Sequence, residues 1–253
     1  MPRLTDYPLL VFVLSLIGLW PCSQLGAAVR RRQEAHGGHA PETFTIILTA
    51  SLTLLGLIVG FTFSMAVSRY DQRKIYEEEE ANAIGTEYVR AGLLPASDAA
   101  MTRTLLRSYL DQRILLYQTR EEDRRVEIRQ RITQLHGQLW STVQNAALAQ
   151  PSALTALVAA GMNTVINSQG YTQAAWWNRI PTAAWLLMLL IALLCSVMVG
   201  YATSGATVRS LVLLILPLLL GIAFMLIADI DSPRGGLIHV AAQNMAALSE
   251  TMR

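Results

Sequence analysis

Few side chains in this sequence have the types and the spacing that chemistry requires. His36 and His39 stand three residues apart in a glycine-rich loop and could share a metal ion, but no cysteine or carboxylate cluster completes a ligand set, so a solvated loop is favoured. His136 and His239 are isolated and favour structural roles. No nucleophile elbow, His-Glu-x-x-His motif or phosphate-binding loop occurs. The sequence therefore predicts a protein that is not an enzyme and uses no metal or cofactor.

The four consecutive glutamates Glu77–Glu80 are a second candidate. A solvated helical turn is the simplest interpretation of such a charge run. However, successive helical residues point about 100° apart, so four in a row cover every side of a helix. At least one of these carboxylates must therefore face a neighbouring element.

A stripe of small and hydroxyl side chains is the third candidate. Its members recur every three or four residues, which places them along one side of a helix. They are Thr45, Thr49, Thr53, Gly56, Gly60, Ser64 and Ser68. Such a stripe either packs against a neighbouring helix or forms a wettable, pore-facing wall. The spacing alone favours packing.

The elements that must position these residues are apolar helices. Four runs contain no Asp, Glu, Lys or Arg, namely residues 7–29, 43–68, 180–208 and 210–228. Each run is long enough to span a bilayer, at roughly 20 residues per helical crossing. Because no charged side chain lies inside any run, a proton-coupled pump is disfavoured, which leaves a passive pore or a structural protein.

The segment between the second and third runs has a different composition. Residues 69–179 hold 13 of the 20 basic and 12 of the 18 acidic residues. This near balance predicts a salt-bridged helical surface. The net charge of the whole chain is only +2, which argues against nucleic acid as a partner.

Helical periodicity dominates this charged segment. Only Gly85 interrupts residues 65–91, so the second apolar helix is expected to continue out of the membrane as one rod. Further helices are expected after Ser97 as N-cap, over 121–150 and over 152–168. No strand pattern appears. The predicted fold class is all-α, with four transmembrane helices and a helical domain inserted between the second and the third.

Several motifs between about residues 44 and 240 form a recognisable set. They are Gly60-Phe61-Thr62-Phe63-Ser64-Met65-Ala66, Arg69-Tyr70-Asp71, Glu79-Glu80-Ala81-Asn82-Ala83-Ile84-Gly85, Leu93-Leu94-Pro95, Tyr109-x-x-x-Arg113 and Ile230-Asp231-Ser232-Pro233-Arg234-Gly235-Gly236-Leu237-Ile238. Together they resemble the bacterial bestrophin-like membrane family and, more distantly, the bestrophin ion channels.

Bestrophins form pentameric rings whose second helix lines a hydrophobic neck, so the resemblance implies the same arrangement here. The implied neck residues are Phe61 and, one and two turns earlier, Leu57 and Thr53. A narrow ring of apolar side chains can gate ions by dewetting. Thr53 puts a hydroxyl at one level of this neck, which makes that level wetter.

Past the neck, the resemblance implies a vestibule with Arg69, Glu77 and Glu80 on its wall. A ring of carboxylates concentrates cations, which predicts a preference for cations. Calcium-gated bestrophins carry a dense acidic run after the fourth helix. Only Asp229 and Asp231 stand there in this sequence, so calcium gating is not expected.

The resemblance also implies an orientation in a bacterial inner membrane, with both termini and the central segment in the cytosol. The arginines at 30–32 would then lie outside, against the positive-inside tendency. Five basic residues near span ends on the other side oppose them. These are Arg69, Arg73, Lys74, Arg179 and Arg234. The count narrowly favours a cytosolic central domain.

The leading hypothesis is therefore an oligomeric, pentameric channel for inorganic ions in a lipid bilayer. The alternative is a non-conducting membrane scaffold whose central helices bind a partner. Five segments are expected. They are 1–42 (first transmembrane helix and loop), 43–95 (second transmembrane, pore helix with cytosolic extension), 96–179 (helical cytosolic domain), 180–228 (third and fourth transmembrane helices) and 229–253 (C-terminal tail).

Overall fold

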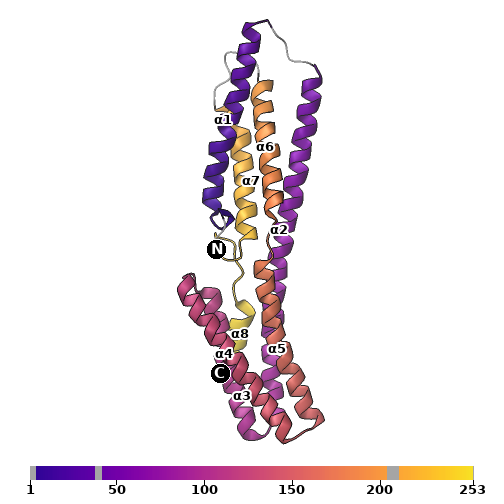
Figure 1. The fold of residues 1–253 in the computed structure, drawn as a ribbon, viewed down its shortest axis with the longest axis vertical. Coiled ribbons are helices and arrows are strands. Elements are labelled where there is room, and N and C mark those ends of the chain that lie inside the picture. Colours follow the sequence, from indigo (N-terminus) through magenta and orange to yellow (C-terminus); the bar gives the residue numbers. More distant parts are fainter. Residues whose placement is uncertain (1–3, 38–41, 204–210, 253) are drawn as a thin grey trace. The chain divides into compact units, whose positions relative to one another are not determined.

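The computed structural model describes residues 4–37, 42–203 and 211–252. These ranges contain helices and no strands, which confirms the predicted all-α fold (Figure 1). The α-helices are α1 (Pro8–Ala35), α2 (Glu42–Arg90), α3 (Ala96–Gln118), α4 (Glu122–Ala149), α5 (Ala153–Trp177), α6 (Thr182–Ala202), α7 (Ile215–Asp231) and α8 (Gln243–Thr251). Short 3-10 helices are η1 (Leu4–Asp6), η2 (Ala91–Leu93) and η3 (Val212–Leu214).

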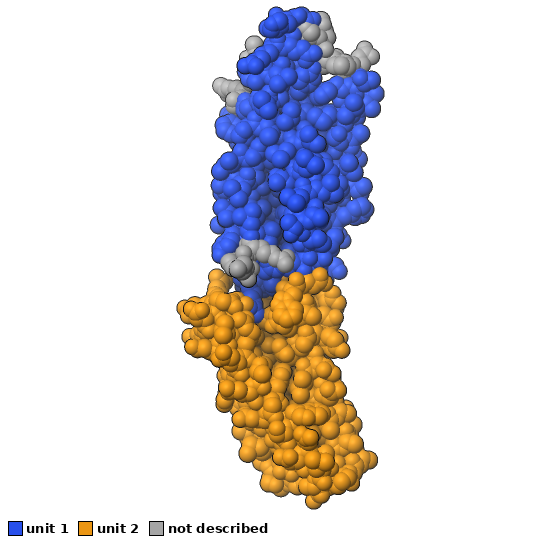
Figure 2. Space-filling model, in the orientation of Figure 1, with its two compact units in different colours: residues 1–70, 179–239 blue, residues 71–178, 240–253 orange. Residues whose placement is uncertain are grey.

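The chain forms two compact units, which Figure 2 colours separately. Unit 1 comprises residues 1–70 and 179–239, and unit 2 comprises residues 71–178 and 240–253. The helix α2 contributes its apolar part to unit 1 and its charged part to unit 2, as expected for an apolar helix that continues as a charged rod. Of the residues expected as a C-terminal tail, 229–239 belong to unit 1 and 240–253, which include α8, belong to unit 2.

Four helical stretches in the described ranges are long and apolar enough to cross a membrane. They are Pro8–Ala35, Thr43–Leu93, Ala153–Ala202 and Val212–Asp231. Their apolar parts coincide with the four runs that lack charged residues. The prediction of four apolar helices is confirmed.

Small residues bring α1 and α6 into close contact in unit 1. A Cβ atom built at Gly26 would lie 1.9 Å from the carbonyl oxygen of Val197, and one at Gly200 would lie 1.9 Å from that of Ser23. Such backbone approach is typical of transmembrane helix contacts, where dispersion forces rather than water drive packing. Close small-residue packing within the chain is therefore found between α1 and α6.

The core of unit 2 is built from the end of α2 together with α3, α4, α5 and α8. Its members recur at helical spacing, so each helix turns one apolar stripe inward. The most deeply buried include Ile84, Leu106, Tyr109, Leu110, Leu139, Val158, Met162 and Val165. Burying each large apolar side chain contributes about 1.5–3 kcal/mol.

A capping box starts α5, which runs on to Trp177, beyond the end expected near residue 168. The Ser152 hydroxyl accepts a hydrogen bond from the Thr155 amide at 3.1 Å, and the Thr155 hydroxyl accepts one from the Ser152 amide at 3.1 Å. The prediction of Ser97 as the N-cap of α3 is wrong. Pro95 occupies that position without a side-chain cap, because its extended backbone leads directly into Ala96.

Replacing Ser152 with alanine is expected to lower the free energy of unfolding by about 0.5–2 kcal/mol, because the Thr155 amide loses its hydrogen-bond acceptor. The matched control is Ser97→Ala, which removes no capping bond and is expected to change stability by less than about 0.5 kcal/mol. Thermal unfolding of both variants in one detergent measures the difference. Equal losses would contradict the capping role of Ser152.

Candidate functional site

The helix α2 has two different faces within unit 1. Leu55 is 2% exposed and packs in the core with α1, α6 and α7, while Ala66 is 0% exposed and packs near Ile227 of α7. The predicted neck residues lie away from these contacts. Leu57 is 52% exposed and Phe61 is 66% exposed. Large apolar side chains on one side of α2 are therefore not covered by their own chain.

The stripe of small and hydroxyl residues is also exposed along its whole length. No neighbouring atom lies within 4 Å of a Cβ built at Gly56 or Gly60. At these two positions the stripe therefore does not pack against another helix of the same chain. What covers the stripe has to be another subunit, lipid or water.

The hydroxyl groups of this stripe already use their protons in the helix. Thr49 donates to the carbonyl oxygen of Thr45 at 2.9 Å, and Thr53 donates to that of Thr49 at 2.9 Å. Only acceptor lone pairs remain on these oxygens. A shallow groove over this part of α2 is lined by Thr45, Ile46, Thr49, Ala50, Thr53, Leu54 and Leu57. Its wall is apolar with a line of hydrogen-bond acceptors.

Arg69, the first predicted vestibule residue, lies where three segments of unit 1 meet. Its Nη1 atom is 3.7 Å from Oδ1 of Asp231 at the end of α7. The same carboxylate accepts hydrogen bonds from the backbone amide of Ile180, just before α6, at 3.1 and 3.3 Å. Asp231 therefore ties the start of α6 to the end of α7 beside α2.

The carboxylates at the end of α7 have hydrogen-bond donors from the protein itself. Asp229 accepts hydrogen bonds from the amides of Leu237 at 2.8 Å and Ile238 at 3.3 Å. Asp6 of η1 forms an ion pair with Arg179. In the part of the chain that the structure describes, no three His, Cys, Asp or Glu residues are grouped so that they could hold a metal ion.

Gly236 closes the turn after α7 in a conformation that requires glycine. Its φ is +78°, and a Cβ there would lie 1.5 Å from Oδ1 of Asp229. We expect Gly236→Ala to lower the free energy of unfolding by more than about 2 kcal/mol, since left-handed backbone costs a side chain about 1–2 kcal/mol and the carboxylate must also move.

The control for this substitution is Gly37→Ala. Gly37 has nearly the same φ, +76°, but no atom lies within 4 Å of a Cβ built at this position. It should show only the backbone cost of about 1–2 kcal/mol. Unfolding of both variants under one condition separates backbone strain from the clash. If the two lose equal stability, Asp229 does not constrain the turn.

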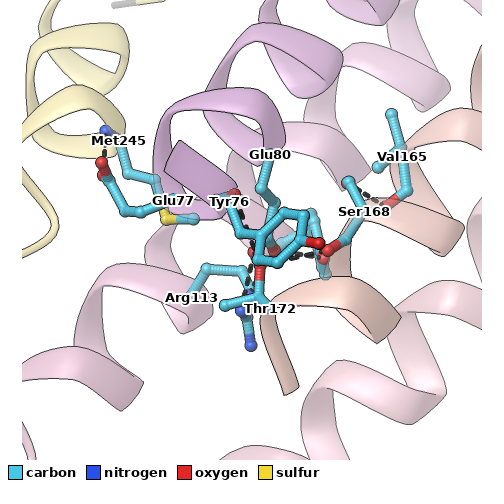
Figure 3. Close-up of polar contacts among 9 residues, drawn as sticks. Tyr76, Glu77, Glu80, Arg113, Val165, Ser168, Thr172 and Met245 are labelled. Carbon is cyan, nitrogen blue, oxygen red and sulfur yellow. Dashed lines mark hydrogen bonds and ion pairs between the residues drawn. The ribbon is translucent and has the colours of Figure 1, made fainter. Parts of the chain in front are cut away.

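Glu80 is the centre of a buried polar network in unit 2 (Figure 3). Its carboxylate accepts two hydrogen bonds from Arg113, one from Nε at 2.5 Å and one from Nη2 at 2.8 Å. Tyr109 donates its hydroxyl proton to Oε1 at 2.9 Å, and Thr172 donates to Oε2 at 2.8 Å. All four side chains are 0–1% exposed. The network therefore joins α2, α3 and α5 through one carboxylate.

This environment raises the pKa of two members of the network, Tyr109 and Arg113. Burial raises the pKa of Tyr109 well above its usual value, and the Glu80 charge raises it further. Burial lowers the pKa of Arg113, but the charge and hydrogen bond of Glu80 together with Tyr109 and Tyr117 outweigh that effect and raise the pKa overall. The guanidinium also lies over the ring of Trp176, 5.9 Å from its centroid. The arrangement is a buried, doubly hydrogen-bonded ion pair that joins α2 to α3.

Glu77 holds the C-terminal helix in unit 2. Its carboxylate accepts hydrogen bonds from the amide of Met245 at 3.0 Å and from the side chain of Asn244 at 2.7 Å. Both residues stand in the first turn of α8, where amides have no helical partner and a negative charge is favourable. Figure 3 shows the Met245 contact.

The glutamate run is therefore divided between two environments. Glu77 and Glu80 are 2% and 0% exposed, whereas Glu78 and Glu79 are exposed. The expectation that at least one carboxylate faces a neighbouring element is confirmed. The sequence did not identify the partners, although the position of Arg113 in the apolar period of residues 105–117 was a signal, since a lone arginine there needs a buried anion.

Of the histidine pair His36 and His39, the structure describes only His36. His36 is exposed at the end of α1, and its Nδ1 atom lies 2.8 Å from the carbonyl oxygen of Arg32. His39 lies outside the described residues. The solvated-loop interpretation of this pair stays a prediction.

Comparison with solved structures identifies relatives of the same fold. A crystal structure of a bacterial Bestrophin homolog from Klebsiella pneumoniae superposes with a TM-score of 0.66 at 16% identity, covering 95% of this chain and 95% of that chain. Two variants of that homolog, each with a mutation, give TM-scores of 0.67 at 15% identity (95% and 96% covered) and 0.69 at 14% identity (95% and 93% covered). No curated protein matches the chain.

The sequence itself matches a family model over nearly its full length. The model is described as the Bestrophin-like domain, and the match covers residues 9–245. The matched range includes α2, the Glu80 network and the turn after α7. The apolar helices and the fold agree with this assignment. This membrane protein belongs to the Bestrophin-like family.

Proposed function

We propose that this chain is the subunit of an oligomeric ion channel whose pore is lined by α2. The observation that carries the proposal is the uncovered face of α2, where Phe61 and Leu57 are more than half exposed although the helix is apolar enough to cross a membrane. Five copies around an axis would bring these faces together, as in the bestrophin rings that the family resemblance implies.

In this proposal Thr53, Leu57 and Phe61 form the neck. A ring of phenyl and isobutyl groups makes a narrow, dry constriction that water and ions enter only at a cost in solvation free energy. The threonine level is wetter, and its hydroxyl oxygens present acceptors rather than donors. Acceptor oxygens stabilise cations, which supports cation preference at this level.

The vestibule past the neck is proposed to involve Arg69 and the turn Glu77–Glu80. Glu77 and Glu80 act from inside the subunit, because their buried carboxylates fix α8, α3 and α5 against α2. The exposed carboxylates of Glu78 and Glu79 then supply the negative charge that concentrates cations.

The proposed location is a bacterial inner membrane, with the apolar parts of α1, α2, α6 and α7 in the bilayer and unit 2 in the cytosol. The charge-free runs support the first part. The basic residues near the ends of these spans support the second, by the positive-inside tendency.

The test is to record currents from the purified protein in planar bilayers under a potassium chloride gradient. Unitary currents that reverse near the potassium equilibrium potential are expected for a cation-preferring pore. Bilayers that receive detergent alone are the blank. The absence of current from a preparation shown to be folded by circular dichroism and oligomeric by light scattering would overturn the channel and favour the scaffold.

A further inference from the structure

One carboxylate of unit 2 is buried without a hydrogen bond. Glu87, in the last turn of α2, is 0% exposed, and both its carboxylate oxygens lack a hydrogen-bond partner among the residues that the structure describes. Glu77 and Glu80 on the same helix are equally buried but fully bonded. A buried carboxylate without a hydrogen bond is unfavourable, so burial at this position favours the neutral, protonated form of Glu87.

The Glu87 carboxyl group lies against the backbone of α5 at Gly161. A Cβ atom built at Gly161 would lie 1.9 Å from its Oε2 atom and 2.8 Å from Nη1 of Arg90. Only glycine leaves room for the carboxyl group at this point. The contact between α2 and α5 therefore depends on how this one group is held.

The charged groups around Glu87 are few. The helix α5 carries no Asp, Glu, Lys, Arg or His, and its titratable group is Tyr171; η2, which packs against α5, carries none. On α3, Arg103 donates to the carbonyl oxygen of Tyr88 at 3.3 Å, and Arg107 bonds the Tyr88 hydroxyl. Arg90 on α2 is the cation whose field acts on Glu87.

Burial raises the pKa of Glu87 to about 7, and Arg90 opposes this rise only in part. The sign of the pH effect follows from linkage. A carboxyl group with a raised pKa in the folded state binds more protons there than in the unfolded chain, so stability falls as pH rises from about 4.5 to about 7. The upper end of this range lies close to neutral pH.

We propose that Glu87 is a proton-sensitive contact between α2 and α5. In its protonated form it packs neutrally against Gly161. On losing the proton, the carboxylate turns toward Arg90 and water, and the α5 backbone around Gly161 loosens from α2. The contact itself does not depend on channel function; its effect on current rests on that proposed function, because α2 also carries the proposed neck.

Hydrogen exchange of the intact protein at about pH 5 and about pH 8.5 tests the contact, with rates divided by the intrinsic rate at each pH. Protection of the amides around Gly161 is expected to fall several-fold at the higher pH in the wild type and to stay constant in Glu87→Gln. The control Glu79→Gln removes an exposed carboxylate of the same helix and should behave as wild type. Equal pH dependence in wild type and Glu87→Gln would overturn the proposal.

A second pair of variants keeps the test informative if Glu87→Gln folds poorly. Gly161→Ala should lower the unfolding temperature of the wild type, because its Cβ meets the Glu87 carboxyl group. The same change should cost much less in a Glu87→Ala background, where that group is gone. Equal costs in both backgrounds would refute the contact. If the wild-type protein shows the pH-dependent exchange but carries no current in planar bilayers, only the channel proposal is refuted.

Discussion

Replacing Phe61 with alanine is expected to enlarge the unitary current several-fold. Phe61 is 66% exposed in the subunit, so its phenyl ring is available to narrow a pore and adds little to the core of its own chain. Removing one ring from each subunit widens the constriction and lowers the cost of wetting it. Single-channel recording in planar bilayers, side by side with the wild type, measures the change.

The matched control is Phe63→Ala. Phe63 is two residues away, about 200° around the helix, and is 38% exposed. It should leave the unitary current unchanged, because its side chain points away from the proposed axis. The neck would be refuted if Phe61→Ala left the current unchanged and lowered stability by the about 3–5 kcal/mol typical of a buried phenylalanine.

Replacing Glu80 with glutamine is expected to destabilise unit 2 by about 3–5 kcal/mol. The substitution leaves the Arg113 guanidinium buried without a counter-charge, and such a broken pair costs far more than an intact pair contributes. Arg113 is 1% exposed, so water cannot replace the carboxylate. Thermal unfolding of the purified variants, followed by circular dichroism, measures the loss.

Two comparisons make this prediction specific. Glu79→Gln changes the neighbouring, exposed glutamate and should alter stability by less than about 0.5 kcal/mol. Adding Arg113→Met to Glu80→Gln removes the stranded charge, while the new amide oxygen still accepts from Tyr109 or Thr172. The double variant should therefore recover part of the loss, as neutral replacements of buried pairs do. The ion pair would be refuted if the double variant lost as much free energy of unfolding as Glu80→Gln and Arg113→Met lose in sum when made separately.

Much of the fold could be predicted because it depends on local patterns. A run of roughly 20 apolar residues is stable in lipid as a helix, because a helix satisfies its backbone hydrogen bonds within the segment. The run 43–68 therefore became the first part of α2, and the absence of a breaker before Gly85 carried the helix to Arg90. The helix starts were less predictable, because α3 begins at Ala96 after a proline and not at the serine that local preference favoured.

The candidate sites divide in the same way. The family resemblance pointed to Thr53, Leu57 and Phe61, and their spacing of four residues puts them on one side of α2. The four-residue run required at least one glutamate to face a neighbouring element. Spacing could not tell which of the four it was. The structure buries Glu77 and Glu80 and exposes the two between them.

The sequence by itself determined that this protein is an all-helical membrane protein with a charged helical part between its second and third apolar runs, because charge and periodicity act over neighbouring residues. Only the tertiary structure decided which groups meet. Arg113 and Thr172 reach Glu80 across 33 and 92 residues, and Gly161 meets Glu87. Such partners depend on how whole helices pack, and a helical period specifies the face of a helix but not the helix that covers it.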